Sequence, residues 1–149
     1  MKKAQAGLDF LMTYSWALLL IVLVVAALFA LGIFDAGAFV GSRSAGFAQV
    51  RPVAWRLDTD GNLTLKLADD AGTNVNITSI NATFGVANIS YSDSLNISNG
   101  KQSDAILVGS FPNSTAPGAS YSIALQIQYI DMNTNFTYTD GGTVTGKVG

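Results

Sequence analysis

The residues whose type and spacing most clearly suggest chemistry are seven asparagines, each followed two positions later by Ser or Thr. Asn-x-Ser/Thr is the acceptor sequence for N-linked glycosylation. The seven candidates are Asn62, Asn76, Asn81, Asn88, Asn96, Asn113 and Asn135. Residues 52–149 contain ten Asn and 21 Ser or Thr, so roughly two such sequences are expected by chance. The excess predicts a heavily glycosylated, extracytoplasmic domain, and the alternative is a polar, Asn/Thr-rich strand surface without sugars.

Two acidic segments, Asp58–Asn62 and Asp131–Asn135, have the Asp- and Asn-rich composition of calcium-binding loops. Neither has the Gly and the terminal Glu of an EF-hand at the required spacing. Asp, Asn and Gly are also the residues that favour turns. We therefore expect two turns here and no metal site.

The chain contains no His and no Cys, and all ten of its acidic residues are Asp. This composition excludes Ser-His-Asp and Cys-His catalysis, disulfides and iron–sulfur clusters. The formal net charge of −2 gives no basic surface for nucleic acid. We expect a protein that is not an enzyme and binds neither a cofactor nor nucleic acid.

The N-terminal third of the chain is apolar, and Phe10–Phe34 contains no charged residue. As a helix this segment would be ~37 Å long, enough to cross a ~30 Å hydrocarbon core. A helix that is apolar on every side needs lipid or other helices around it. Because apolar residues continue at helical spacing until Pro52, we expect one helix over Ala6–Val50.

Three interpretations of this helix compete. A cleaved secretory signal would use Lys2 and Lys3 as its basic region and Ala36–Ala38 as its cleavage site. Its apolar region should span only ~7–15 residues, which makes this interpretation the weakest. The second interpretation is a plain membrane anchor, and the third depends on the residues that precede the apolar run.

The segment Lys2–Asp9 reads Lys-Lys-Ala-Gln-Ala-Gly-Leu-Asp and is followed directly by Phe-Leu-Met-Thr-Tyr-Ser-Trp-Ala. It resembles the class III signal peptide of archaeal type IV pilin precursors, members of an archaellin-like superfamily. In that family a short basic leader and a small residue precede Gln-x-Ser-x-Glu-x-x-x-Leu. Gln5 matches this pattern, and Gly7, Asp9 and Thr13 stand where Ser, Glu and Leu are usual.

The resemblance implies that a prepilin peptidase cuts between Ala4 and Gln5 on the cytoplasmic side of the membrane. Residues 1–4 are then a leader that is removed, and residues 5–51 are the retained hydrophobic helix. Lys2 and Lys3 hold the N-terminus inside the cell until the cut is made. The implied partners are the membrane, the peptidase, an assembly ATPase with its membrane platform, and other copies of the chain bound through their helices.

Asp9 would become the fifth residue of the cleaved chain, at the edge of the apolar helix. A buried carboxylate is costly unless it is paired. The new amine of a neighbouring subunit could pair with it in a filament and set the register of assembly. The alternative is that Asp9 is simply favourable at a helix N-terminus, through the helix dipole.

From residue 52 to residue 149 the hydrophobic period changes from helical to two, which predicts strands. The expected features are strands at 63–67, 105–111 and 121–129, a strand over 75–86 with a bulge near Ser79, and a hairpin turn at Asp140–Gly142. Phe84 and Val86 are expected on one face, and Asn135 and Thr137 on the face opposite Phe136 and Tyr138. The fold class is therefore α+β, a long N-terminal helix followed by an antiparallel β-sandwich or barrel-like head.

Together these features predict a structural subunit of an archaeal type IV pilus, an adhesive filament at the cell surface. Its precursor would cross the membrane once, with a cytoplasmic N-terminus. The alternatives are an archaellum subunit, a minor pilin, or an anchored surface protein that binds ligands as a monomer.

Overall fold

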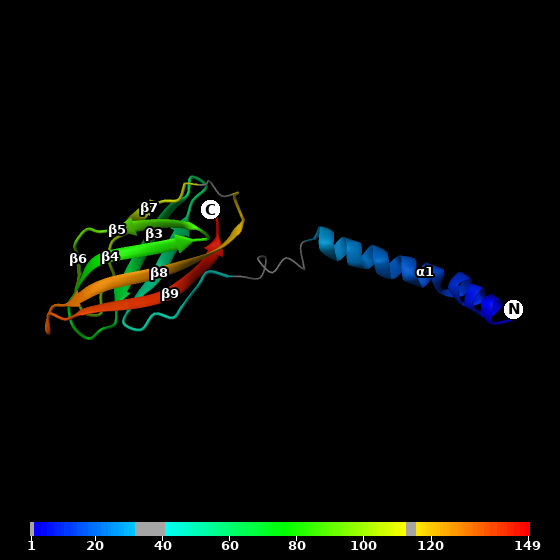
Figure 1. The fold of residues 1–149 in the computed structure, drawn as a ribbon, viewed down its shortest axis with the longest axis horizontal. Coiled ribbons are helices and arrows are strands. Elements are labelled where there is room, and N and C mark those ends of the chain that lie inside the picture. Colours follow the sequence, from blue (N-terminus) through cyan, green and yellow to red (C-terminus); the bar gives the residue numbers. More distant parts are fainter. Residues whose placement is uncertain (1, 32–40, 113–115) are drawn as a thin grey trace. The chain divides into compact units, whose positions relative to one another are not determined.

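The computed structural model describes residues 2–31, 41–112 and 116–149, and the chain divides into two compact units between residues 39 and 40. The first unit contains helix α1 (Lys2–Ala30), and the second contains all the described strands (Figure 1). Every strand pairing is antiparallel. The predicted α+β class, a long N-terminal helix followed by an antiparallel β-head, is confirmed.

The helix is shorter at its C-terminal end than the sequence predicts. Arg43–Ala45 forms a strand and Val50 begins another, so the prediction of a helix as far as Val50 is wrong. Gly46 has a φ of 95°, which is incompatible with an α-helix. Residues 32–40, where the predicted helix would also run, lie outside the described residues.

The described strands of the second unit form two sheets. Their bounds are β1 (Arg43–Ala45), β2 (Val50–Leu57), β3 (Asn62–Asp69), β4 (Val75–Phe84), β5 (Ala87–Tyr91), β6 (Leu95–Ile97), β7 (Ile106–Ser110), β8 (Ser120–Asp131) and β9 (Thr137–Lys147). The six-stranded sheet has the order β1-β9-β8-β4-β5, with β6 also paired to β4. The three-stranded sheet has the order β2-β3-β7.

The two sheets enclose one hydrophobic core, to which inward-facing residues of β2 to β9 contribute. In β8 the core residues are Tyr121, Ile123, Leu125, Ile127 and Tyr129, all buried, and their neighbours between them are exposed. The predicted strands around 63–67, 105–111 and 121–129 are confirmed as parts of β3, β7 and β8. The register of β4 against β8 shifts between Ile77 and Ser79, which confirms the predicted bulge. Val86, however, lies fully exposed in the turn after β4 and does not share a face with Phe84.

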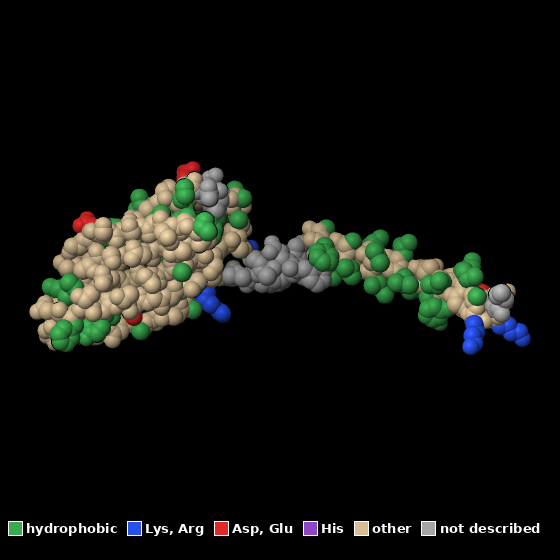
Figure 2. All heavy atoms as spheres, viewed as in Figure 1, with side chains coloured by type: hydrophobic (Ala, Val, Ile, Leu, Met, Phe, Trp, Pro, Cys, Tyr) green, Lys and Arg blue, Asp and Glu red, His purple; other side chains and the backbone are tan. Residues whose placement is uncertain are grey.

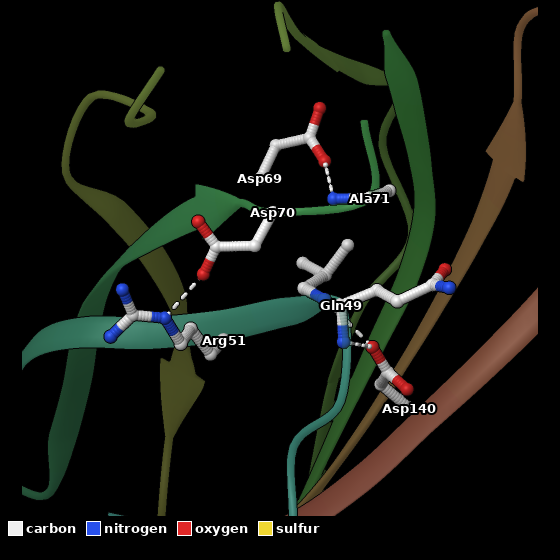
Figure 3. Close-up of polar contacts among 7 residues, drawn as sticks. Gln49, Arg51, Asp69, Asp70, Ala71 and Asp140 are labelled. Carbon is white, nitrogen blue, oxygen red and sulfur yellow. Dashed lines mark hydrogen bonds and ion pairs between the residues drawn. The ribbon is translucent and has the colours of Figure 1, made fainter. Parts of the chain in front are cut away.

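The predicted hairpin turn at Asp140–Gly142 is wrong, because β9 runs through it without interruption. The Asp140 carboxylate accepts hydrogen bonds from the backbone N–H groups of Gln49 (2.9 Å) and Val50 (2.7 Å) (Figure 3). A side chain at Gly142 would collide with the carbonyl oxygen of Ala45. Asp140 and Gly142 therefore allow the segment that leads into β2 to pack closely against β9. The chain reverses direction between β8 and β9 at residues 132–136.

We expect Asp140→Ala to destabilise the protein. The substitution leaves the buried N–H of Val50 and the N–H of Gln49 without their acceptor, and each such loss costs about 1–3 kcal/mol. Chemical denaturation of the full chain in detergent, followed by the fluorescence of the tryptophans, measures the change. Asp93→Ala, at an exposed position, is the control, and equal stability of the two variants would contradict this role for Asp140.

Candidate functional site

The N-terminal segment singled out by the sequence lies at the start of α1. Lys2, Lys3, Ala4 and Gln5 are all exposed and all helical. Asp9 is also exposed, and its carbonyl oxygen accepts a hydrogen bond from the Thr13 hydroxyl (2.8 Å). Since α1 begins at Lys2, Asp9 lies beyond the first helical turn of the intact chain. The helix dipole acts mainly within that first turn and therefore explains little about Asp9 here.

Helix α1 makes no hydrophobic core of its own. None of its 29 residues is buried, and its large apolar side chains are exposed along its length (Figure 2). Its length and composition are sufficient to cross a membrane, although a signal sequence would meet the same criteria. Phe10 and Tyr14, one turn apart, have ring centroids 4.7 Å apart.

Four of the candidate glycosylation sites lie on the outer side of the six-stranded sheet. Asn81, Asn88 and Asn96 are exposed and Asn76 is half-buried, whereas the alternate residues of these strands face the core. Asn76 is directly opposite Asn96, and the Ser94 hydroxyl donates to the Asn76 amide oxygen (2.9 Å). Val75 and Ile77, on either side of Asn76 in β4, are buried and face the core.

Two of these acceptor sequences are interlocked across the sheet. Asn81 pairs with Ser90, and Thr83 pairs with Asn88, so each asparagine stands opposite the hydroxyl residue of the other sequence. The exposed positions of β5 and β8 are likewise uncharged: Asn88, Ser90, Ser120, Ser122, Ala124, Gln126 and Gln128. The outer faces of β4, β5 and β8 are therefore polar and carry mainly hydroxyl and amide groups, while Arg43 and Lys147 are exposed on β1 and β9.

Asn62 differs from these four because its amide nitrogen is already engaged. It donates to Asp58 Oδ2 (3.0 Å), and the Asn62 backbone N–H donates to Asp58 Oδ1 (2.8 Å). A glycan bonded to this nitrogen would have to be accommodated beside the Asp58 carboxylate. Asn62 is consequently the least accessible acceptor among the described candidates.

The remaining two candidates lie in loops. Asn135 is exposed in the turn between β8 and β9, with a φ of 58°. The expectation that it shares a strand face opposite Phe136 and Tyr138 is wrong, because β9 begins only at Thr137 and both aromatic residues are exposed. Asn113 lies outside the described residues.

Both acidic segments that resemble calcium loops are turns held by their first aspartate. Asp58 accepts the backbone N–H groups of Asp60 and Asn62, and Asp131 accepts that of Asn133 (2.8 Å). Hydrogen bonds, chiefly from Asn62 to Asp58 and from Asn133 to Asp131, lower the pKa of each carboxyl. Within the described residues no group of three or more acidic side chains is arranged to hold a metal ion.

The sequence analysis missed two buried carboxylates, Asp69 and Asp140. Both occupy inward positions of strands, where alternation would predict apolar residues, and this break in the pattern is the signal that could have identified them. Asp69 Oδ1 accepts the N–H of Ala71 (2.8 Å), as Figure 3 shows, and Oδ2 has no hydrogen-bond partner. Burial raises the pKa of Asp69, opposed by the hydrogen bond from Ala71.

Two surface hollows of the head are lined by described residues that include no pair of catalytic groups. One of about 410 Å³ is lined by uncharged residues, namely Gly72, Thr73, Asn74, Asn99, Met132 and Asn133. A second, of about 180 Å³, lies on the three-stranded sheet and includes Arg56 and Lys66. Neither brings a nucleophile together with a general base.

Comparison with known proteins leaves the family open. No protein-family model matches the chain, and a search of curated proteins finds no significant match.

We expect Asp69→Asn to stabilise the protein at pH 7, because it removes a buried charge while keeping an acceptor for Ala71. The folded-state pKa of Asp69 lies above its ordinary value of 3.8. As the pH rises from 3.8 through the folded-state pKa, the contribution of Asp69 to the free energy of unfolding therefore falls. The advantage of the variant should therefore disappear below pH 3.8.

Denaturation of both proteins between pH 3 and pH 7 measures this difference, with exposed Asp104→Asn as the control. A stability difference that does not depend on pH would contradict the assignment of a raised pKa to Asp69.

Proposed function

We propose that this protein is a structural subunit of an archaeal type IV pilus, a filament that extends from the cell surface and attaches cells to other surfaces. Its precursor crosses the membrane once, is cleaved by a prepilin peptidase, and is assembled by an ATPase and a membrane platform. The observation that carries the proposal is α1, an apolar helix of 29 residues with no buried residue. The resemblance of Lys2–Thr13 to the class III signal peptide selects the pilus among proteins with such a helix.

The apolar surface of α1 needs a cover, because leaving it in water costs about 25 cal/mol for each Å² of apolar area. Lipid supplies the cover before assembly, and the helices of other copies supply it afterwards. Small residues allow helices to approach closely, and α1 contains several: Ala17, Ala26, Ala27 and Ala30. A filament core built from these helices accounts for an apolar surface that the chain does not bury by itself.

Asp9 is the polar residue that such a core would have to accommodate. Removal of residues 1–4 takes away Lys2 and Lys3 and places a free amine four residues before Asp9. An amine from a neighbouring subunit then offers the opposite charge that a desolvated carboxylate requires. This pairing fixes the axial position of each incoming subunit.

The head fits the outside of such a filament. Its uncharged outer face presents Asn81, Asn88 and Asn96 to solvent, where N-linked glycans would be accommodated without disturbing the core. Neither His nor Cys is present for acid–base or thiol catalysis, which agrees with a structural role. We propose a glycosylated sheath around a core of helices.

Mass spectrometry and negative-stain microscopy of filaments sheared from cells that express the chain test this function. The expected result is filaments whose subunit begins at Gln5 and carries added glycan mass. A soluble product that begins after residue 38 would instead show a cleaved secretory signal. Full-length chains in the membrane without filaments would show a plain anchor.

We expect Asp9→Ala to leave cleavage after Ala4 intact and to reduce filaments by at least about tenfold, since loss of one member of a buried ion pair costs about 3–5 kcal/mol. Immunoblotting of membrane and sheared fractions measures cleavage and assembly separately. Asp93→Ala, an exposed change in the head, should assemble normally. Normal filaments from Asp9→Ala would refute the pairing role.

A further inference from the structure

The outer faces of the two sheets of the head differ in chemistry. Strands β4, β5, β6 and β8 of the six-stranded sheet present mainly hydroxyl and amide groups and carry four candidate glycosylation sites, while its β1–β9 edge carries exposed Arg43 and Lys147. The three-stranded sheet presents the basic groove, which we define as Ala54, Arg56, Thr64, Lys66 and Ala105. This contrast indicates that the two faces meet different surroundings.

The basic groove is built from neighbouring positions on the strands of the three-stranded sheet. Ala54 pairs with Lys66 and Arg56 with Thr64 across β2 and β3, and Thr64 pairs in turn with Leu107 of β7. The hollow between them has a volume of about 180 Å³. Leu107, beside the groove, is 57% exposed, so a large apolar side chain lies next to the cations.

The charge of Lys66 is not neutralised within its own head. Among the described residues the one ion pair is Arg51–Asp70, and Lys66 is exposed with no hydrogen-bond or ion-pair partner. Arg56 donates to the carbonyl oxygen of Gly149 (3.2 Å) and is exposed, and the nearby Asp58 carboxylate partly offsets its charge. An apolar hollow with cations at its rim is suited to a partner that presents both apolar and acidic groups.

Another copy of the same chain presents such acidic groups. Asp60, in the turn before β3, and Asp104, in the segment before β7, are exposed and form no ion pair in the described part of the chain. A helical filament requires heterologous contacts, in which one surface of a subunit meets a different surface of the next. Asp104 directly precedes Ala105 of the groove, whereas Asp60 lies in the turn between β2 and β3, so the Asp60 carboxylate of one copy can face the groove cations of the next.

The positions of the candidate glycosylation sites also favour the three-stranded sheet as the contact surface. The outer side of the six-stranded sheet carries Asn76, Asn81, Asn88 and Asn96, and bulky sugars there would separate neighbouring heads. Among the described candidates, Asn62 lies nearest to the basic groove, and its hydroxyl residue Thr64 is part of the groove. Because Asp58 holds its amide nitrogen, Asn62 is the least accessible of these acceptors.

We propose that the basic groove is the surface through which the head contacts the next copy of this chain, with Lys66 facing carboxylates of that copy. This inference rests on the proposed function, since it requires that the chain forms filaments. It adds a head-to-head contact to the association of the helices.

The absence of cysteine from the chain allows a direct test by single-site labelling. Lys66→Cys and the matched control Ser122→Cys, exposed on the six-stranded sheet, are each reacted with a maleimide in filaments and in detergent-dissociated subunits. We expect assembly to slow labelling of Lys66→Cys by at least about tenfold, because a contact surface excludes solvent. Labelling of Ser122→Cys should change by less than about twofold.

Equal labelling of Lys66→Cys in filaments and in dissociated subunits would overturn the proposal while leaving the filament itself established. Absence of filaments from the unmodified chain would instead refute the proposed function, and the inference with it. If Lys66→Cys fails to assemble, Lys66→Arg and Lys66→Glu decide the matter. The proposal requires that Lys66→Arg assembles normally and that Lys66→Glu assembles poorly, and equal assembly of the two overturns it.

Discussion

The constraint on which the rest of the structure depends is the uncovered surface of α1. A run of apolar residues this long cannot remain in water, and the described part of the chain buries none of it. The cover must come from lipid or from other molecules, and this requirement underlies the proposed membrane precursor and filament. The head needs no such cover, because its hydrophobic core is enclosed between its own two sheets.

The head combines one shared core with two dissimilar outer surfaces. Strands β4 and β8 place apolar residues inward and amides and hydroxyls outward, whereas β2 and β3 place cations outward beside small apolar residues. Burial on one side of a strand leaves its other side free to vary, because successive side chains point to opposite faces. The fold can therefore carry two outer faces of different composition without any cost to the core.

The sequence predicted those elements whose signal is local. Alternation identified β3 and β8, and the change of parity near Ser79 located the bulge in β4. Contacts between distant segments were not visible in the same way. Asp140–Gly142 has the composition of a turn, yet Asp140 accepts a hydrogen bond from the backbone of Gln49, some ninety positions earlier in the sequence. The end of the helix was misplaced for the same reason, since β1 is a strand only because β9 is beside it.

The pairing of β1 with β9 also orders the events of folding. Arg43, in the first strand of the head, is in register with Thr145, four residues before the last one given. The six-stranded sheet can therefore be completed only after β9 has been synthesised. Contacts between residues so distant in sequence are typical of domains that fold in milliseconds to seconds. Until β8 pairs with it, β4 lacks one of its neighbours in the sheet, and enzymes that act on unfolded segments can reach its backbone.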